Sequence, residues 1–197
     1  YGTEFHMTSD SKLFPPLPKW EAQGYHPDEY GHWLKGDWRP ATSFGSSFST
    51  LDPNAPPHER AATITTRPGL LLSRDGTHAI RIEDVDDVAI PLYQGGMIGA
   101  LDPLYQGFAG GTGHGVQWAE IGWENKGAGP QYLMAWKNAS QRPSVNSSGR
   151  ILFRYIANPT NERTMMCARG LSWPAGHTLG VINCENPNAV SALLNSF

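Results

Sequence analysis

The chain has 197 residues, of which 39% are hydrophobic and 17% charged, and its formal net charge is −3. This length suits one large domain or two small ones, with enough apolar mass for a core. The 22 glycines and 16 prolines exceed the usual share without reaching the low-complexity range, which argues against a disordered tail, a collagen-like chain or a coiled coil. The longest apolar runs are a handful of residues, so we expect no membrane span.

Residues 1–60 are expected to be irregular. The run from Phe14 to Trp20 contains three prolines and predicts an extended, stiffened arm. Farther along, Trp33, Trp38 and Phe44 are large apolar groups that need burial, so this stretch is expected to pack on another body.

Residues 61–98 contain strand and turn signals. The β-branched run Ala62–Thr66 predicts a strand, and Pro68-Gly69 and Asp75-Gly76 supply turns, so residues 61–82 are expected to form a strand, a turn and a strand. Residues 88–98 predict a buried strand that ends in a diglycine turn.

The second half of the chain alternates loops with short elements. Five glycines within Gly107–Gly115 predict a loop with unusual backbone angles. Tyr132–Trp136 and Ile151–Ile156 predict strands, and Ala189–Phe197 has helical spacing. Together these elements predict an α+β fold, with a mixed or antiparallel β core, few short helices and long loops. A second small N-terminal subdomain is an alternative to a simple arm.

Neither metal nor catalytic motifs occur. Cys167 and Cys184 are interpreted as two buried, reduced thiols of a cytosolic protein, because neither has a Cys or His two to four residues away. The seven histidines are scattered and are interpreted as surface or core residues. Phosphate-binding glycine motifs and a nucleophile elbow are also missing. We therefore expect no metal site and no catalytic residue in this chain.

Charge is distributed unevenly along the chain. Residues 1–98 carry 8 basic and 13 acidic side chains, giving −5, whereas residues 99–197 carry 7 basic and 5 acidic ones, giving +2. All seven of these basic residues lie between Lys126 and Arg169, where Glu162 is the one acidic residue. Such an excess suits either a polyanion-binding face or an ordinary solvated surface.

The segment Ile151–Met166 carries the most specific pattern. An apolar strand containing Arg154 is followed by a polar turn, then by Glu-Arg-Thr and another apolar run. An arginine inside an apolar strand needs a carboxylate or phosphate partner. An internal pair that braces the turn, either Arg154 with Glu162 or Arg163 with a glutamate, is one interpretation.

This segment resembles the "lafRdia…tNeRTmi" signature that follows the catalytic domain of single-chain type IIG restriction–modification enzymes. The related adenine-specific DNA methyltransferases of phage-exclusion systems carry the same signature. Further blocks resemble the family in its own order, and the clear similarity covers residues 88–197. These blocks are Tyr1–Phe14, Ile90–Ile98 with the following Ala100-Leu101-Asp102, Gly176–Leu179 and Ala192–Phe197.

The chain also departs from this family. Gln94 stands where the family usually has Glu, and Gly96 and Gly99 stand where it has basic or polar residues. The family's S-adenosylmethionine-binding glycine motif and its Asn/Asp-Pro-Pro-Tyr/Phe motif do not occur in these residues. The resemblance thus implies a DNA target-recognition region without its methyltransferase domain. Residues 1–60 would be an arm or linker after that domain, and residues 61–197 the recognition domain, ending before the C-terminal helices.

In the resembled bacterial enzymes, the catalytic domain flips an adenine and methylates its N6, while the recognition region reads base edges and holds phosphates of double-stranded DNA. The fragment itself is expected to hold no cofactor. S-adenosylmethionine, and Mg where the parent is also a nuclease, belong to a cytoplasmic parent enzyme. The expected base-reading residues are Gln106, His114, Gln117, Asn138, Gln141 and Arg142. The expected phosphate contacts are Lys126, Lys137, Arg150 and Arg169. The expected structural signature residues are Arg154, Asn161, Glu162 and Arg163.

Two other classes of function compete with this interpretation. A β-rich carbohydrate- or ligand-binding module would expose an aromatic platform rather than a basic face. A scaffold domain without a nucleic-acid role would expose a large apolar patch.

Overall fold

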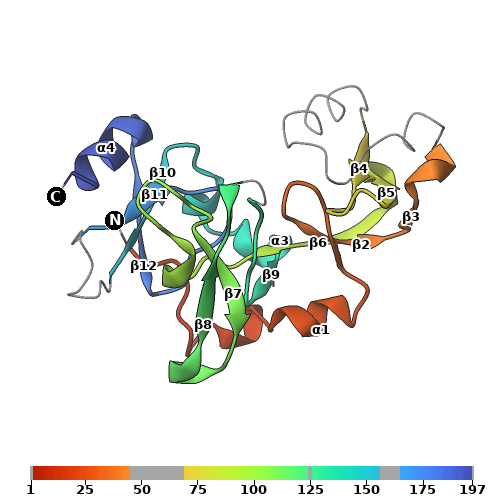
Figure 1. Cartoon of the computed structure of the whole chain (residues 1–197), viewed down its shortest axis with the longest axis horizontal. Helices are drawn as coiled ribbons and strands as arrows, with labels where there is room; N and C mark the ends of the chain where they lie inside the picture. Colours follow the sequence, from red (N-terminus) through yellow and green to blue (C-terminus); the bar gives the residue numbers. More distant parts are fainter. Residues whose placement is uncertain (1, 45–68, 124–125, 156–164, 197) are drawn as a thin grey trace. The chain divides into compact units, whose positions relative to one another are not determined.

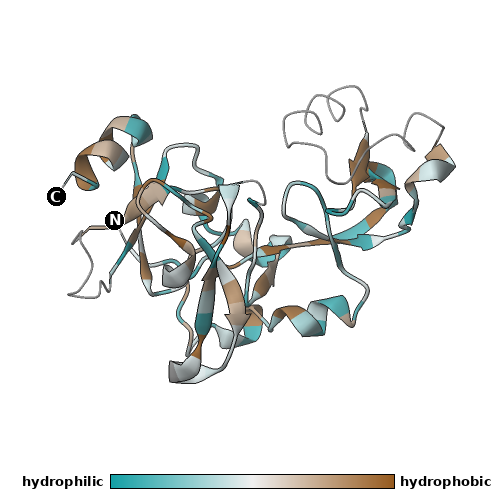
Figure 2. Ribbon diagram, in the orientation of Figure 1, coloured by the Kyte–Doolittle hydropathy of each residue, from teal (hydrophilic) through white to brown (hydrophobic). Residues whose placement is uncertain are grey.

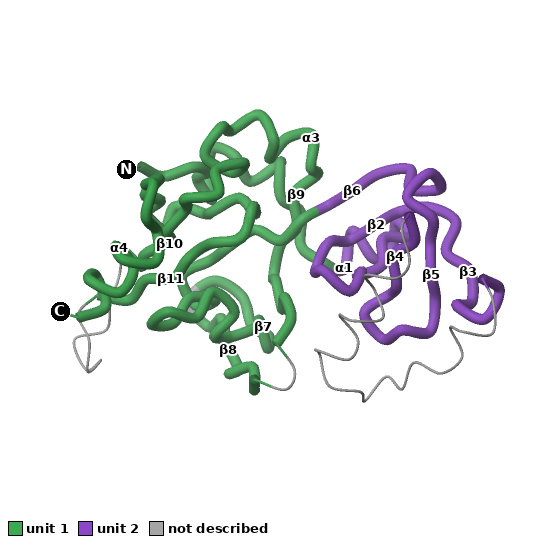
Figure 3. Tube along the Cα trace, turned by 90° about the horizontal axis from the view of Figure 1, so that it is seen from above, with its two compact units in different colours: residues 1–17, 90–197 green, residues 18–89 purple. Residues whose placement is uncertain are grey.

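The structure is a computed structural model that describes residues 2–44, 69–123, 126–155 and 165–196. The chain forms two compact units (Figures 1 and 3). Unit 1 contains residues 1–17 and 90–197, and unit 2 contains residues 18–89. The boundary that the sequence suggested, between residues 60 and 61, lies outside the described residues. The two units instead divide the chain at residues 17 and 89.

The described part of unit 2 is built from short antiparallel strands, one α-helix and short 3-10 turns. Strand β2 pairs with β1 on one side and with β6 on the other, while β5 pairs with β3 and β4. Its elements are α1 (Leu17–Glu21), β1 (His26–Pro27), β2 (Trp33–Gly36), β3 (Arg39–Pro40), β4 (Leu70–Leu72), β5 (His78–Arg81) and the first part of β6 (Val85–Pro91). Buried Trp33, Leu34, Ala79 and Ile80 supply its core.

The proline-rich run is only partly extended. Pro16 forms a bridge with Tyr132, as expected of an extended arm, but Leu17–Glu21 forms helix α1. The prediction of an arm through Trp20 was therefore wrong, because a proline in the first turn of a helix needs no amide donor. The carbonyl of Pro18 accepts from the Ala22 amide, and buried Trp20 meets Tyr25 edge to face at 4.9 Å between ring centroids.

Unit 1 contains a three-stranded antiparallel sheet in the order β11-β10-β12 and a separate β7–β8 hairpin. The end of β6 neighbours β9, and Figure 2 shows the hydrophobic residues along β6. The remaining elements are β7 (Gln106–Gly110), β8 (Gln117–Glu120), β9 (Leu133–Ala135), α3 (Trp136–Ala139), β10 (Arg150–Arg154), β11 (Cys167–Arg169), β12 (Leu179–Asn183) and α4 (Pro187–Leu194).

Helix α4 packs against the β11-β10-β12 sheet. Its first turn is capped by the Asn186 side chain, which accepts from the Ala189 amide. At its end, the Asn195 side chain donates to the Cys167 carbonyl at 2.9 Å and accepts from the Cys167 amide at 3.2 Å. Cys167 is buried and Cys184 half-buried, and both are free thiols. The pairing of Asn195 with a β11 residue fixes α4 on the sheet.

The α+β prediction is confirmed, with mostly antiparallel strands and a few short helices in the described part of the chain. Strands were found where predicted at β6, β9 and β10, and α4 begins two residues before the predicted helix. Gly69 and Gly76 have the positive φ values of 82° and 71° that the predicted turns require. The predicted strand Ala62–Thr66 lies outside the described residues.

The glycine-rich segment Gly107–Gly115 is only partly a loop. Its first half forms β7, so the prediction of a loop throughout was wrong. Its second half does adopt unusual angles, with φ of 85° at Gly111 and 57° at Gly113. Within β7, the backbone of Gly107 lies close to that of Gly129. A Cβ at Gly107 would lie 3.3 Å from the Gly129 Cα, so a glycine suits this position.

Candidate nucleic-acid interface

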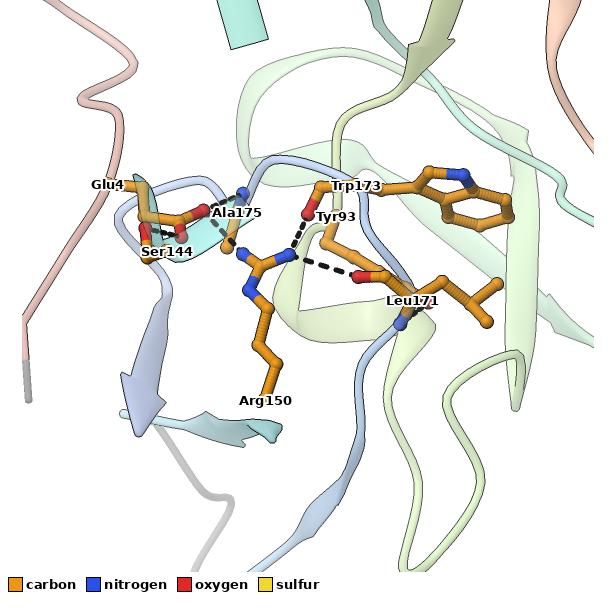
Figure 4. Close-up of polar contacts among 7 residues, drawn as sticks. All are labelled: Glu4, Tyr93, Ser144, Arg150, Leu171, Trp173 and Ala175. Carbon is orange, nitrogen blue, oxygen red and sulfur yellow. Dashed lines mark hydrogen bonds and ion pairs between the residues drawn. The ribbon is translucent and has the colours of Figure 1, made fainter. Parts of the chain in front are cut away.

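Arg150, a predicted phosphate contact, lies in the core of unit 1. Its side chain is completely buried, and its Nη2 lies 2.5 Å from Oε2 of Glu4. Nη1 donates to the carbonyl of Leu171 at 3.0 Å and to that of Trp173 (Figure 4). Burial lowers the pKa of the Arg150 guanidinium, and the Glu4 carboxylate opposes that shift. The phosphate prediction for Arg150 was therefore wrong, because internal acceptors hold a guanidinium that solvent does not reach.

The Glu4 carboxylate also joins the network to two other segments. Its Oε2 accepts from the Ala175 amide at 2.8 Å, and its Oε1 accepts from the Ser144 hydroxyl. Figure 4 shows these partners converging on one carboxylate. The N-terminal segment, β10 and the loop after α3 are thereby joined at one buried point.

Lys126, a second predicted phosphate contact, also has an internal partner. Its Nζ lies 2.6 Å from Oδ2 of Asp102 and 3.0 Å from the Leu104 carbonyl, and it lies over the Trp123 ring at 4.7 Å. Its side chain is 18% exposed. Asp102 neutralises this charge, so the structure does not place Lys126 among the open cations.

The exposed residues among the predicted DNA-contacting cations lie in α3, after it and on β11. Lys137, Gln141 and Arg142 are exposed, and Asn138 is half-buried. Arg169 is exposed on β11 and donates to the Ser148 carbonyl at 3.4 Å, which places it beside the loop that follows α3. We name the exposed side chains of residues 136–148 together with Arg169 the α3 surface.

The α3 surface rests on a buried support. Ala139 and Val145 are fully buried, and the Ser144 hydroxyl donates to Glu4. The Arg142 guanidinium lies 5.3 Å from the centroid of the Phe5 ring. No acidic residue occurs in the sequence from Lys126 to Asn161. These contacts hold the segment after α3 in place, with its cations and amide side chains towards solvent.

The other base-reading candidates lie on the β7–β8 hairpin. Gln106 is half-buried and pairs with Glu120 across the hairpin, while Gln117 is exposed and pairs with Gly110. His114 lies in the connecting turn, Gly113–Gly115. Figure 3 shows the hairpin and α3 on opposite sides of unit 1. The structure therefore places Lys137, Asn138, Gln141 and Arg142 on one segment, with Arg169 beside the end of that segment at Ser148, and separates them from the hairpin group.

Two departures from the family block have a packing reason. A Cβ at Gly96 would lie 2.4 Å from the Trp118 ring, and one at Gly99 would lie 2.7 Å from Cγ of Tyr105. Aromatic rings thus cover both glycines. Gln94, at the third departure, donates through Nε2 to Oε1 of Gln131 at 3.1 Å.

Arg154 lies half-buried at the end of β10. Its Nη2 donates to the Gly96 carbonyl at 3.4 Å, and burial lowers the pKa of its guanidinium. Its Nε has no hydrogen-bond partner among the described residues. The other signature residues, Asn161, Glu162 and Arg163, lie outside the described residues, and so does the expected Arg154–Glu162 pair.

Sequence reasoning missed a pocket of about 600 Å³ in unit 2. Its lining comes from residues 26–27, 38, 73–75 and 78. The sequence analysis interpreted its histidines as ordinary surface or core residues and Trp38 as an apolar group to be buried. No local motif joins these separate segments, so folding alone assembles the pocket.

In comparisons with known proteins, no family model, curated protein or solved structure matches this chain. None of the helices in the described ranges is long and apolar enough to cross a membrane. Within the same ranges, no three or more His, Cys, Asp or Glu side chains gather as metal ligands would.

Proposed function

We propose that this chain is the DNA target-recognition portion of a site-specific adenine-N6 DNA methyltransferase or restriction–modification enzyme. In this proposal, the α3 surface of unit 1 contacts double-stranded DNA. A methyltransferase domain of the same protein, outside these residues, binds S-adenosylmethionine and carries out the methyl transfer. The family resemblance of the collinear sequence blocks supports the enzyme class.

One observation carries the DNA-binding part of the proposal. The α3 surface exposes Lys137 and Arg142 beside amide side chains, in a part of the chain without acidic residues, and Arg169 lies next to Ser148 at the end of that segment. Exposed cations suit phosphate contacts, and Asn or Gln amides suit the edge of adenine, each good pair giving about 1–3 kcal/mol of discrimination. In this proposal, Lys137 and Arg169 hold phosphates, while Asn138, Gln141 and Arg142 face base edges.

The test is fluorescence anisotropy of the chain on a random duplex of about 30 base pairs, titrated at several salt concentrations. For duplex DNA, log K falls with log[salt] by about 0.9 per phosphate contact. The triple variant Lys137→Ala, Arg142→Ala, Arg169→Ala should bind more weakly, with a slope flatter by about 2 to 3.

The matched control removes three exposed lysines outside the α3 surface, Lys12, Lys19 and Lys35, each changed to Ala. This variant changes the net charge by the same amount as the first one. Because its lysines lie outside the α3 surface, it should keep most of the salt-dependence slope. Equal losses in both triple variants, or no DNA binding at low salt, would overturn the proposal.

A further inference from the structure

The pocket of unit 2 has the size of a small-molecule site. Its volume of about 600 Å³ falls within the roughly 300–1,000 Å³ that ligand pockets usually occupy. Its lining includes Trp38, Arg74, Asp75 and the two histidines His26 and His78. The described residues of its lining all belong to unit 2, and none of them belongs to the α3 surface.

Backbone hydrogen bonds hold the lining segments in place. The Arg74 amide donates to the Pro27 carbonyl at 2.9 Å, which joins the β4–β5 turn to β1. The Ser73 amide donates to the His78 carbonyl at 2.9 Å, and β3 pairs with β5 so that Pro40 lies opposite His78. The pocket is therefore a preformed feature of the unit.

Rings form one corner of the pocket. The rings of His26 and Trp38 lie 6.3 Å apart at an angle of 81°. Trp38 donates through Nε1 to the Leu34 carbonyl at 3.1 Å. A ligand can therefore contact the indole through its ring surface. Stacking on an aromatic ring accepts any nucleobase, because every base has a π face.

Two carboxylates in the described part of the pocket region accept hydrogen bonds from the chain itself. Oδ1 of Asp75 accepts from the Ser73 hydroxyl at 2.5 Å, from the Thr77 amide at 3.0 Å and from the Thr77 hydroxyl at 2.8 Å. Burial alone would raise the Asp75 pKa, but these hydrogen bonds lower it. Both oxygens of buried Asp28 are likewise occupied, by the amides of Tyr30 and His32 and by the His32 ring.

The same contacts fix the hydrogen on His78. Since the Thr77 hydroxyl gives its proton to the ionised Asp75, it must accept a hydrogen bond from Nδ1 of His78, which lies 2.8 Å away. The Nδ1 position therefore carries the proton, and Nε2 is left to accept a hydrogen bond from a ligand. Among the described lining residues the cation is Arg74, and a guanidinium suits the oxygens of a phosphate.

We propose that this pocket binds a nucleoside monophosphate unit, with its base stacked on Trp38 and its phosphate accepting hydrogen bonds from Arg74. The histidines His26 and His78 border the same ligand. The unit is either a free mononucleotide or one nucleotide of a single DNA strand, because both present this chemistry. The proposal does not depend on duplex binding by the α3 surface.

The test is isothermal titration calorimetry of the whole chain with adenosine monophosphate, cytidine monophosphate, adenosine, inorganic phosphate and glucose. Both nucleotides should bind, and adenosine and phosphate should each bind about tenfold more weakly or worse, since each has only one of the two recognised groups. Trp38→Leu should weaken both nucleotides about tenfold or more. Arg74→Gln should weaken the nucleotides but leave adenosine unchanged.

Trp123→Leu is the matched control, because Trp123 is 77% exposed and lies in the other unit. It should leave nucleotide binding unchanged. Circular dichroism shows whether the pocket variants are folded. Should Trp38→Leu unfold, the unmodified chain labelled with 15N-tryptophan provides a second measurement. Adenosine monophosphate should then shift the indole signal of Trp38 and not that of Trp123.

Three outcomes would overturn the proposal: no nucleotide binding, glucose binding more tightly than both nucleotides, or an unmoved Trp38 signal at saturating nucleotide. A single-stranded oligonucleotide distinguishes the two sources. Loss of its binding in the Trp38→Leu variant, with duplex binding retained, assigns the pocket to a nucleotide of a strand. Loss of mononucleotide binding alone assigns it to a free nucleotide. The triple variant of the α3 surface should keep its nucleotide affinity, so a failure of duplex binding is distinguishable from a failure of the pocket.

Discussion

Oε2 of Glu4 lies 2.5 Å from Nη2 of Arg150, across 146 residues of sequence, with the two side chains 5% and 0% exposed. The same carboxylate accepts from the Ala175 amide and from the hydroxyl of Ser144, which belongs to the loop of the α3 surface. The conformation of that loop therefore depends on the buried Glu4–Arg150 ion pair. The proposed DNA contact and the stability of unit 1 are linked through Glu4.

Glu4→Gln should lower the free energy of unfolding by about 3–5 kcal/mol, because it leaves the buried Arg150 charge without its partner. Urea unfolding, followed by circular dichroism, measures the loss. The control is Asp37→Asn, which breaks the Arg39–Asp37 pair at the same N–O distance of 2.5 Å but with both side chains more than half exposed. That variant should lose far less stability, because solvent screens the exposed pair. Equal losses would show that the burial of Glu4 and Arg150 adds nothing to their pairing.

Gly96→Ala should destabilise unit 1 by about 1–3 kcal/mol, because its Cβ would overlap the Trp118 ring. Gly115→Ala is the control, since a Cβ there meets nothing within 4 Å. A second variant tests the cause. Trp118→Ala removes the ring, so adding Gly96→Ala to it should cost much less than Gly96→Ala alone. A loss of the same size in both backgrounds would assign the cost to the backbone and not to Trp118.

Much of the fold could be predicted because its signals are local. The apolar run of β10, the Asp75-Gly76 turn and the helical spacing of α4 each lie within a few consecutive residues, and each was found in place. The burial of Arg150 could not be predicted in this way. It depends on Glu4 and on the carbonyls of residues 171 and 173, which only the folded chain brings together.

The same distinction between local and long-range signals applies to the candidate site. Lys137, Asn138, Gln141 and Arg142 are neighbours in sequence, so their common surface follows from one exposed segment. The hairpin candidates Gln106 and Gln117 were grouped with them by residue type alone, and Figure 3 shows their hairpin on the other side of unit 1. The pocket of unit 2 had no signal in the sequence, since its residues come from separate segments between His26 and His78.

Tyr25 should make unit 2 sensitive to alkaline pH. Burial and the 2.6 Å hydrogen bond to Asp87 raise its pKa to about 12. Since an unfolded tyrosine ionises near pH 10, the contribution of Tyr25 to stability is complete below about pH 10 and is lost as the pH rises toward about 12. Tyr25→Phe should cost about 1–2 kcal/mol at neutral pH and reduce the alkaline loss.

Urea unfolding between neutral and strongly alkaline pH measures this effect. The variant should keep part of the pH dependence, because burial also raises the pKa of Tyr93. Tyr155→Phe is the control, since Tyr155 is 42% exposed. An unchanged pH profile in Tyr25→Phe would contradict the assignment to Tyr25.

The two thiols should differ in reactivity. Cys167 is fully buried, and burial raises its thiol pKa, so at neutral pH it forms less of the thiolate that attacks a disulfide reagent. Cys184 is half-buried and should react first with Ellman's reagent in the native chain. Asn195→Ala removes the hydrogen bonds that fix the end of α4 to Cys167, at an expected cost of about 1–3 kcal/mol. This variant should expose Cys167 through opening of α4 and speed its reaction, while the rate at Cys184 stays the same. Equal acceleration at both thiols would mean that the variant loosens the whole unit, and that Asn195 does more than hold α4 on β11.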